Sequence, residues 1–432
     1  MAWDFETDEE FEDLLIWIRR FVEEEVAPLD HLLEHPHDVA HPDNRRLVPP
    51  LQAKVKEMGL WACHLEPELG GQGYGQLKLA LMNEVLGRAR FAPIVFGCQA
   101  PDSGNAEILA KYGTEEHKQL YLQPLLDGDI VSCFSMTEPH AGSDPTMFTV
   151  RAELDGNHWV INGDKWFSSN ARFASFLIVL AVTDPEAPPY RRMSMFIVPR
   201  ETPGITILRS VNVGLDSGKE GTHGYVRYEN VRIPADHMLG DPGDGFVVAQ
   251  TRLGGGRIHH AMRTMGQIAR AFDMMCERAL SRETKGEKLA EKQMVQEKIA
   301  DSWVEMEMFR LLVLRTAWKI DKLKDYRAVR KDIAAVKAMM PKVYHDVATR
   351  ALQVHGALGM SNEMPLTSMV LGSLRMGIVD GPTEVHKQTV ARQVLREHEG
   401  VETLFPSQHL PALKEQALAR YGHLLDLEIG NE

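Results

Sequence analysis

The chain has 432 residues, 44% hydrophobic and 25% charged, which is typical of a globular protein large enough for two or three domains. Its formal net charge of −13 argues against nucleic acid as the main partner, because binding to phosphates needs a basic face. We also expect no membrane span, since no segment approaches the roughly 20 consecutive apolar residues that would cross a bilayer.

The N-terminal residues Met1–Glu12 are rich in acidic side chains, unlike a secretory signal or a mitochondrial transit peptide. We therefore expect a cytoplasmic protein, with the matrix of a processed protein as the alternative. The four cysteines are scattered without CxxC spacing, at Cys63, Cys98, Cys133 and Cys276. This pattern is typical of reduced thiols. We expect no metal site, because the histidines within His31–His41 match no metal-binding arrangement.

The first part of the chain has apolar residues at helical spacing, as in Phe11–Ile18 and Leu77–Val85. The glycine-rich segment Gly70–Gly75 interrupts this pattern as a loop. The pattern of apolar residues then changes, and from about Ile130 to Leu239 the chain is expected to form strands.

Three short β-branched or aromatic runs predict strands in this middle part, at Trp159–Ile161, Phe176–Val182 and Met195–Val198. Asp155-Gly156 and Asn162-Gly163 are expected to form tight turns between strands.

From Phe246 onward helical periodicity returns, and long helices are expected at Ile258–Arg282, Glu287–Leu323, Ala328–Val354 and from about Thr383 to His398. The predicted order is an N-terminal α-helical domain over 1–128, a middle β domain over 129–240, a C-terminal α-helical bundle over 241–400 and a tail over 401–432. This is an α+β organisation. Its two seams would create clefts, where ligand sites tend to lie.

The segment Cys133–Asp144 reads as a strand that runs into a turn rich in hydroxyl groups and glycine. Such a turn can offer side-chain oxygens and backbone N–H groups to a flat, polar heteroaromatic ligand. The alternative is a loop whose Thr and Ser side chains satisfy only their own backbone.

The same segment resembles the TEPxAGSD signature of the acyl-CoA dehydrogenases. Pro67–Gly73 resembles the family's PExxGGxG loop, Asn162–Asn170 its NGxKxWITN strand, and Gln353–Gly359 its QxxGGxG stretch. Four motifs in the family's order are far more specific than any one of them. The resemblance implies FAD as cofactor and a fold with an N-terminal α-helical domain, a middle β-barrel or sandwich, and a C-terminal four-helix bundle.

Three further segments, Gln99–Asn105, Gly254–His260 and Asp380–Pro382, resemble a bacterial and animal branch that carries an Asp-Gly-Pro motif. Some members of that branch are fused to a kinase-like domain, and we expect no such domain in these 432 residues.

The resemblance implies that one set of residues lies along or beside the isoalloxazine ring: Phe134, Met136, Thr137, Ser143, Phe167 and Ser169. Thr137 would hydrogen-bond the flavin. Phe167 stands where many members carry Trp, so ring stacking is kept while the indole donor is lost.

A second set matches positions around the pyrophosphate and adenine half of FAD. Gln353, Gly356 and Glu384 belong to it, and Arg282 and Gln293 match positions that reach the FAD of a neighbouring subunit. A guanidinium suits a pyrophosphate because it pairs oxyanions bidentately. This part of the resemblance implies a homodimer or homotetramer. Taken alone, Arg282 would be interpreted as a solvated charge at a helix end.

Asp380 aligns with the catalytic Glu in the family's YEGTxxIQ motif, which implies that it removes the substrate α-proton. Other members carry the base at a position that here is Gly256, so that place is empty. The residues alone allow another interpretation, in which Asp380 or Thr383 caps the following helix. For a base, we expect burial with an apolar acyl chain to raise the pKa of the carboxyl.

The implied reaction is dehydrogenation of an acyl-CoA thioester to the trans-2-enoyl-CoA, as in fatty acid β-oxidation, with electrons passed to an electron-transfer flavoprotein. Arg257 and Ser143 would contact the substrate. Two alternatives remain open. One is an oxygen-using relative, either an acyl-CoA oxidase or a nitroalkane-oxidase-like enzyme, and the other is a non-catalytic scaffold. His259 and His260 are adjacent on a helix and face different sides, so they cannot bind one ion as a pair.

Overall fold

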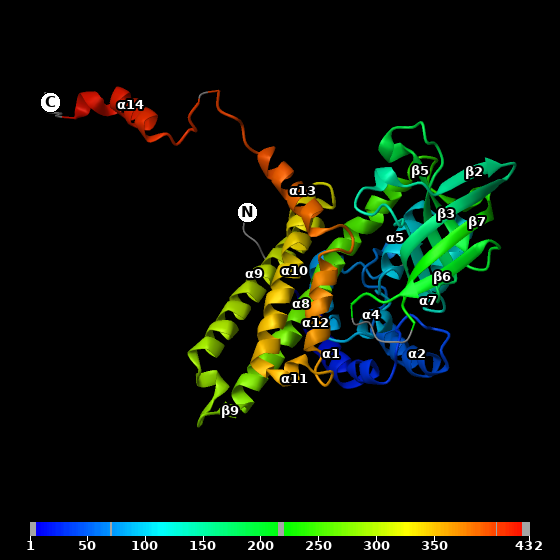
Figure 1. Ribbon diagram of the computed structural model, residues 1–432, viewed down its shortest axis with the longest axis horizontal. Coiled ribbons are helices and arrows are strands. Elements are labelled where there is room, and N and C mark those ends of the chain that lie inside the picture. Colours follow the sequence, from blue (N-terminus) through cyan, green and yellow to red (C-terminus); the bar gives the residue numbers. More distant parts are fainter. Residues whose placement is uncertain (1–5, 70, 215–219, 403, 426–432) are drawn as a thin grey trace.

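The computed structural model describes residues 6–69, 71–214, 220–402 and 404–425. Its N-terminal part is helical (Figure 1) and consists of α1 (Glu9–Phe21), α2 (Pro42–Glu57), α3 (Gly75–Leu86), α4 (Ala92–Val95), α5 (Asp102–Tyr112), α6 (Glu115–His117) and α7 (Gln123–Asp127). Within the described ranges, no helix is both long and apolar enough to cross a membrane.

One sheet follows, built from β1 (Ser132–Ser135), β2 (Arg151–Asp155), β3 (His158–Ser169), β4 (Phe176–Val182), β5 (Met193–Pro199), β6 (Ile205–Val211), β7 (His223–Pro234) and β8 (Met238–Leu239). The strand order is β6-β7-β3-β1-β4-β5-β8, and β2 pairs with both β3 and β4. Neighbouring strands are mostly antiparallel, while β4 runs parallel to both β1 and β2.

Strand β4 lies at the centre of the middle domain, and each of its residues is buried. Phe176, Ile178 and Leu180 join a core shared with helix α5, whereas Leu177 and Val179 join a separate core on the other side of the sheet. A strand buried on both faces reads as a continuous apolar run, which is how the sequence predicted it.

The predicted tight turn at Asn162-Gly163 is wrong. Both residues lie inside β3, where the pairing with β7 shifts register between Ile161 and Gly163. Gly163 has φ +127°, and a Cβ there would lie 2.9 Å from Val150 Cγ2. Glycine therefore serves a β-bulge at this position.

The C-terminal part comprises α8 (Gly245–Ser281), β9 (Glu283–Thr284), β10 (Glu287–Lys288), α9 (Gln293–Leu323), α10 (Arg330–His355), α11 (Ala357–Met360), α12 (Leu366–Met376), α13 (Thr383–Leu395) and α14 (Leu410–Tyr421). Helices α8, α9, α10 and α12 pack as a bundle, and α3 of the N-terminal part joins the same core. Helix α14 extends away from the rest of the molecule (Figure 1). The predicted fold class, helices around a central β domain, is confirmed.

The helix predicted to begin at Glu287 begins later, at Gln293. Lys285 and Gly286 have φ values of +51° and +79° and form a tight turn between the short strands β9 and β10. Two consecutive residues of positive φ suit the turn of a β-hairpin and end any helix.

Candidate active site

Asp380 lies in the turn between α12 and α13. It has φ +54° and is followed by Gly381 with φ +104°. Helix α13 begins after Pro382 and has no side-chain cap, while the Thr383 hydroxyl donates to the Gly377 carbonyl at 3.2 Å. The capping alternative for Asp380 and Thr383 is therefore wrong. An aspartate in the left-handed backbone conformation is uncommon and persists where the surrounding structure enforces it.

Lys337 of α10 supports this turn from inside the bundle. Its Nζ donates to the carbonyls of Val379 at 2.9 Å and Met376 at 3.1 Å. The side chain is 1% exposed, and burial lowers its pKa to about 8. The backbone around Asp380 is thus tied to a neighbouring helix by a buried cation.

The Asp380 carboxylate faces helix α8. His260 Nε2 lies 3.2 Å from Asp380 Oδ2, and the two side chains are 23% and 19% exposed. Arg257 Nε donates to the Asp380 carbonyl at 3.1 Å, and His386 Nε2 lies 3.3 Å from the same oxygen. A Cβ at Gly256 would stand 3.8 Å from Oδ2. The empty position on α8 and the carboxylate therefore border the same space.

Burial alone would raise the pKa of Asp380, but its neighbours outweigh burial. The hydrogen bond to His260, together with the charges of Arg252 and Lys337, holds the pKa of this carboxyl below its usual range. Burial lowers the pKa of His260 itself, so its contribution at neutral pH is the hydrogen bond of a neutral ring. The pKa expected with a bound acyl chain stays a prediction, since these neighbours act before any substrate is present. The carboxylate is ionised at neutral pH, which is the form that can accept a proton.

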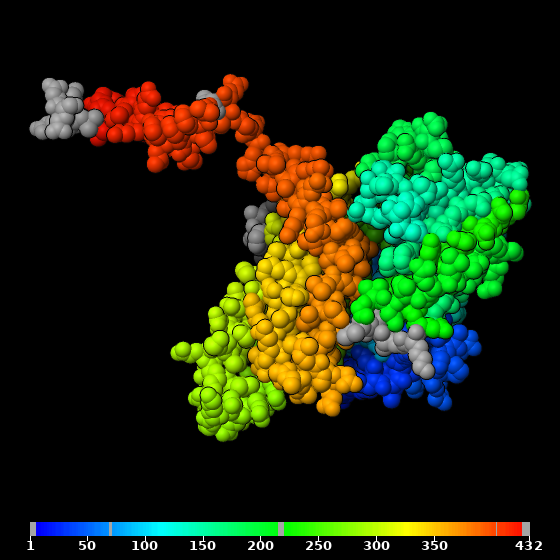
Figure 2. All heavy atoms as spheres, in the orientation of Figure 1, coloured from blue at the N-terminus to red at the C-terminus, as the bar shows by residue number. Residues whose placement is uncertain are grey.

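Arg252 connects this cluster to the β domain. Its guanidinium lies 3.9 Å above the Phe134 ring of β1, and its Nε donates to Asn105 Oδ1 of α5 at 2.9 Å. Phe134 is paired with Ser169 of β3. The ends of β1 and β3 therefore lie beside the helix that faces Asp380. The surface is hollowed where the orange α12–α13 segment faces the β domain (Figure 2).

Phe167 presents an aromatic surface at this end of β3. It has φ +52°, is 48% exposed, and stacks on Trp166 with ring centroids 4.8 Å apart. The indole Nε1 of Trp166 is buried and has no partner in the part of the chain that the structure describes. Ser169 Oγ lies 2.9 Å from His223 Nδ1. An open ring face with polar groups around it fits a flat heteroaromatic group such as a flavin.

A buried ion pair fixes the turn that follows β1. Lys165 Nζ lies 2.9 Å from Glu138 Oε1, both side chains have no exposed surface, and Lys165 also donates to the Met136 carbonyl at 2.7 Å. Thr149 and Val150 also donate to the Glu138 carboxylate, and His140 Nε2 lies 3.6 Å from its Oε2. Met136 and Thr137 are consequently held on a rigid support and are half-buried.

The remaining candidate residues are not all brought together within one chain. Arg282, Gln293, Gln353 and Gly356 are exposed on the bundle. Figure 1 places β9, which follows Arg282, at the end of the bundle remote from the sheet. Three others lie nearer to Asp380 or β1, with Glu384 exposed on α13, Ser143 exposed in the turn after β1, and Arg257 partly buried on α8.

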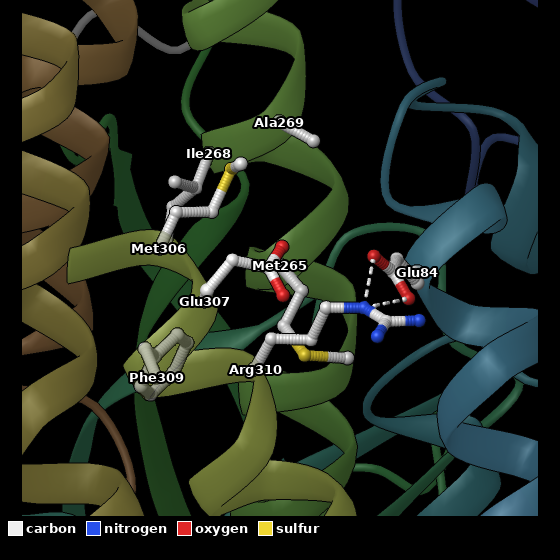
Figure 3. A pocket seen from close by; sticks show the side chains of 8 residues that line it. All are labelled: Glu84, Met265, Ile268, Ala269, Met306, Glu307, Phe309 and Arg310. Atoms are coloured by element: carbon white, nitrogen blue, oxygen red, sulfur yellow. Dashed lines mark hydrogen bonds and ion pairs between the residues drawn. The ribbon is translucent and has the colours of Figure 1, made fainter. Parts of the chain in front are cut away.

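A cavity of about 40 Å³ lies elsewhere, lined by residues of α3, α8 and α9 (Figure 3). Arg310 Nε donates there to both carboxylate oxygens of Glu84, at 2.9 and 3.0 Å. The space is close to that of one water molecule. It is a packing void of the bundle and borders none of the residues around Asp380.

Sequence reasoning missed three supporting residues: His260, Lys165 and Lys337. His260 was expected to face away from its neighbour, and this is confirmed, because His259 Nε2 contacts Gln76 Oε1 at 3.2 Å instead. The contact of His260 with Asp380 joins residues far apart in the sequence, so no local sequence pattern indicates it. A signal did exist for Lys165, since it belongs to one of the quoted motifs and its partner Glu138 to another.

An ionised carboxylate beside a helix glycine and an open aromatic ring both lie where the bundle meets the β domain, and such seams are where ligand sites tend to lie. Comparisons with known proteins show the class of enzyme. Family models for the acyl-CoA dehydrogenase N-terminal, middle and C-terminal domains match residues 8–129, 133–231 and 243–395. The chain belongs to the acyl-CoA dehydrogenase family of flavoprotein oxidoreductases.

Named relatives and solved structures are similar over most of the chain. Probable acyl-CoA dehydrogenase FadE2 of Mycobacterium tuberculosis is 43% identical over 81% of this chain and 86% of its own length. Acyl-CoA dehydrogenase family member 11 of Gallus gallus is 40% identical over 88% of this chain, which spans about half (50%) of that relative. A Mycobacterium abscessus structure assigned as an acyl-CoA dehydrogenase is 38% identical with a TM-score of 0.83, covering 91% of this chain and 100% of the other.

Proposed function

We propose that the chain catalyses α,β-dehydrogenation of an acyl-CoA thioester to the trans-2-enoyl-CoA, with Asp380 as the base. The observation that carries the proposal is the Asp380 carboxylate, held ionised by His260 at 3.2 Å and bordering the space at Gly256. In the reaction the Cα–H bond breaks and its proton passes to an Asp380 oxygen. The electron pair of that bond forms the second Cα–Cβ bond as hydride leaves Cβ.

FAD is the cofactor that we propose, held at its ring by one set of residues: Phe134, Met136, Thr137, Ser143, Phe167 and Ser169. Its support is the half-exposed Phe167 ring and the buried ion pair that fixes the turn carrying Thr137. When bound, FAD supplies the acceptor for the hydride that leaves Cβ.

The thioester carbonyl needs donors as its α-carbon loses a proton. The backbone N–H of Asp380 donates to no acceptor in the described ranges and is available for this carbonyl. The positive φ of Asp380 sets the direction of both this N–H and the carboxylate. Arg257, which donates to the Asp380 carbonyl, and Ser143, exposed in the turn after β1, are proposed to contact the acyl-CoA.

We propose assembly of at least two copies, and the position of the second residue set supports it. Arg282, Gln293, Gln353, Gly356 and Glu384 are proposed to bind the distal half of FAD, with Arg282 and Gln293 reaching the FAD of a neighbour. The outward side of α9 carries exposed apolar residues: Met294, Trp303, Val304, Met308 and Leu311. A hollow of about 370 Å³ beside them is lined mainly by apolar residues of α8 and α9. Apolar patches of this kind mark protein contacts, and we propose a homodimer or homotetramer.

Electrons are proposed to pass to an electron-transfer flavoprotein. The second candidate is an oxygen-using enzyme of the same fold, acyl-CoA oxidase or nitroalkane-oxidase-like. Nitroalkane-oxidase-like relatives also use an aspartate base, so Asp380 fits this candidate as well.

The test is an anaerobic titration of the purified flavin-loaded protein with acyl-CoAs of graded length and branching, followed by mass spectrometry of the product. Bleaching of the flavin bands with loss of two hydrogen atoms from one class of acyl-CoA supports the proposal. Bleaching only by nitroalkanes, or rapid oxygen consumption by the reduced protein, supports the second candidate. Protein that neither contains nor binds FAD contradicts both.

A further inference from the structure

One contact of the proposed base comes from a histidine whose neighbour on the same helix faces elsewhere. His260 Nε2 lies 3.2 Å from Asp380 Oδ2, and both groups keep part of their surface exposed. His259 instead contacts Gln76 of α3 and is 5% exposed. Adjacent residues on a helix point about 100° apart, so these histidines meet different surroundings.

The other groups around Asp380 contact backbone carbonyls at or before this residue and do not contact its carboxylate. Arg257 and His386 contact its carbonyl oxygen, and Lys337 binds the carbonyls of the two residues Val379 and Met376. Only the His260 ring is within hydrogen-bond distance of a carboxylate oxygen, among the residues that the structure describes. The imidazole is thus the group that can set the direction of the carboxylate.

Rotation of the Asp380 side chain would move the oxygens away from any α-carbon placed beside Gly256. An aspartate has one χ1 and a broad χ2 torsion, and a single hydrogen bond to one oxygen limits both. That bond leaves Oδ1 free for the incoming proton. It also favours the ionised form, because a donor to a carboxylate stabilises its charge.

We propose that His260 is a positioning residue, which orients the Asp380 carboxylate through Nε2 and keeps it unprotonated until the α-proton of the substrate arrives. The inference rests on the proposed function, in which Asp380 is the base. Cationic groups of two packed helices face the same site: Arg252, Arg257 and Arg263 come from α8, and Lys337 comes from α10. Burial lowers the pKa of His386 on α13 to about 4, so this ring is neutral at neutral pH. Removal of His260 therefore weakens the support of the ionised form without abolishing it.

The experiment measures exchange of the α-proton and does not depend on hydride transfer. The probe is an acyl-CoA analogue with sulfur in place of the β-carbon, which can lose an α-proton and has no β-hydrogen. The FAD-loaded protein is incubated with this probe in D₂O from pH 3 to 9, a range that reaches below the usual pKa of an aspartate, and deuterium uptake is followed by mass spectrometry. The variants are His260→Ala, His260→Gln and, as matched control, His259→Gln.

In His260→Ala we expect the acid limb of the exchange profile to lie at least one pH unit above that of the unmodified protein. The plateau rate should also fall at least tenfold. His260→Gln keeps a neutral hydrogen-bond donor, so its acid limb and plateau rate should lie between those of His260→Ala and the unmodified protein. This variant tests the inference if His260→Ala does not fold. His259→Gln should leave the acid limb unchanged.

An acid limb and a plateau in the folded His260 variants equal to those of the unmodified protein would overturn the inference. A uniform loss of rate without movement of the limb would do the same, since it indicates only altered packing. Failure of the proposed function has a different signature, because the unmodified protein would then exchange no α-proton, or Asp380→Asn would exchange it at the unmodified rate.

Discussion

The buried pair of Lys165 and Glu138 allows a magnitude to be worked out for one substitution, Lys165→Met. Both side chains have no exposed surface, so the change leaves the Glu138 carboxylate buried without its lysine counter-charge. The remaining ionisable neighbour is the half-exposed His140 ring, 3.6 Å from Oε2. Breaking a buried ion pair on one side costs about 3–5 kcal/mol. The backbone N–H groups of Thr149 and Val150 and the Thr149 hydroxyl still donate to the carboxylate. We therefore expect the lower end, about 3 kcal/mol of unfolding free energy.

The assay is urea unfolding followed by far-UV circular dichroism. The matched control is Arg227→Met, which breaks the Arg227–Asp164 pair between β7 and β3, with side chains 43% and 25% exposed. Exposed pairs contribute about 0–1 kcal/mol. A loss in Lys165→Met that is no larger than in the control would refute the reasoning. Because Lys165 also holds the Met136 carbonyl at 2.7 Å, the variant should bind FAD more weakly, as measured by flavin retained on gel filtration.

Three further predictions concern the base, a titrating carboxyl and a helix contact. Asp380→Gly combined with Gly256→Glu should reduce flavin at least tenfold faster than Asp380→Gly alone, because a Cβ at Gly256 lies 3.8 Å from Oδ2 of the native base. Equal rates in stopped-flow absorbance would contradict this. Burial raises the pKa of Glu107 to about 7. The folded chain then binds more protons than the unfolded chain between about pH 4.5 and pH 7, so stability falls as pH rises through this window, by up to about 3 kcal/mol. Glu107→Gln should reduce the fall of Tm with rising pH. An unchanged slope of Tm against pH would contradict this prediction. Gly266→Ala places a Cβ 2.1 Å from the Glu84 carbonyl oxygen and should lower the unfolding free energy by about 2–3 kcal/mol in urea. A variant as stable as the parent would show that α3 and α8 can separate freely.

The fold class was predictable because the elements differ in periodicity. Phe176–Val182 was predicted as a strand and forms β4 with the same bounds. The errors arose where a local signal has two meanings. Asn162-Gly163 signals a tight turn or a bulge, and pairing with β7 decides for the bulge. Helix α12 was not predicted, since Leu366–Met376 lies between glycines, and its stability comes from packing on α10.

The candidate site was predictable as far as family motifs reached. Asp380 was found by resemblance, and the helix cap that the residues alone favoured is wrong because Pro382 and Thr383 begin α13 without it. The environment of the base was not predictable. His260 and Lys337 approach Asp380 from α8 and α10, and only tertiary structure brings these helices together. The hydrogen bond of His260 and the charge of Lys337 oppose the effect that burial alone would have on the pKa of the carboxyl.

The central claim is that Asp380 removes the α-proton, and the most direct measurement is the anaerobic single-turnover rate of flavin reduction in Asp380→Asn. Asparagine keeps the size of the side chain and cannot accept the proton. With FAD retained and an acyl-CoA that reduces the unmodified protein, we expect a rate loss of about 10³-fold or more. A rate within tenfold of the unmodified protein would contradict the claim and direct attention to another base.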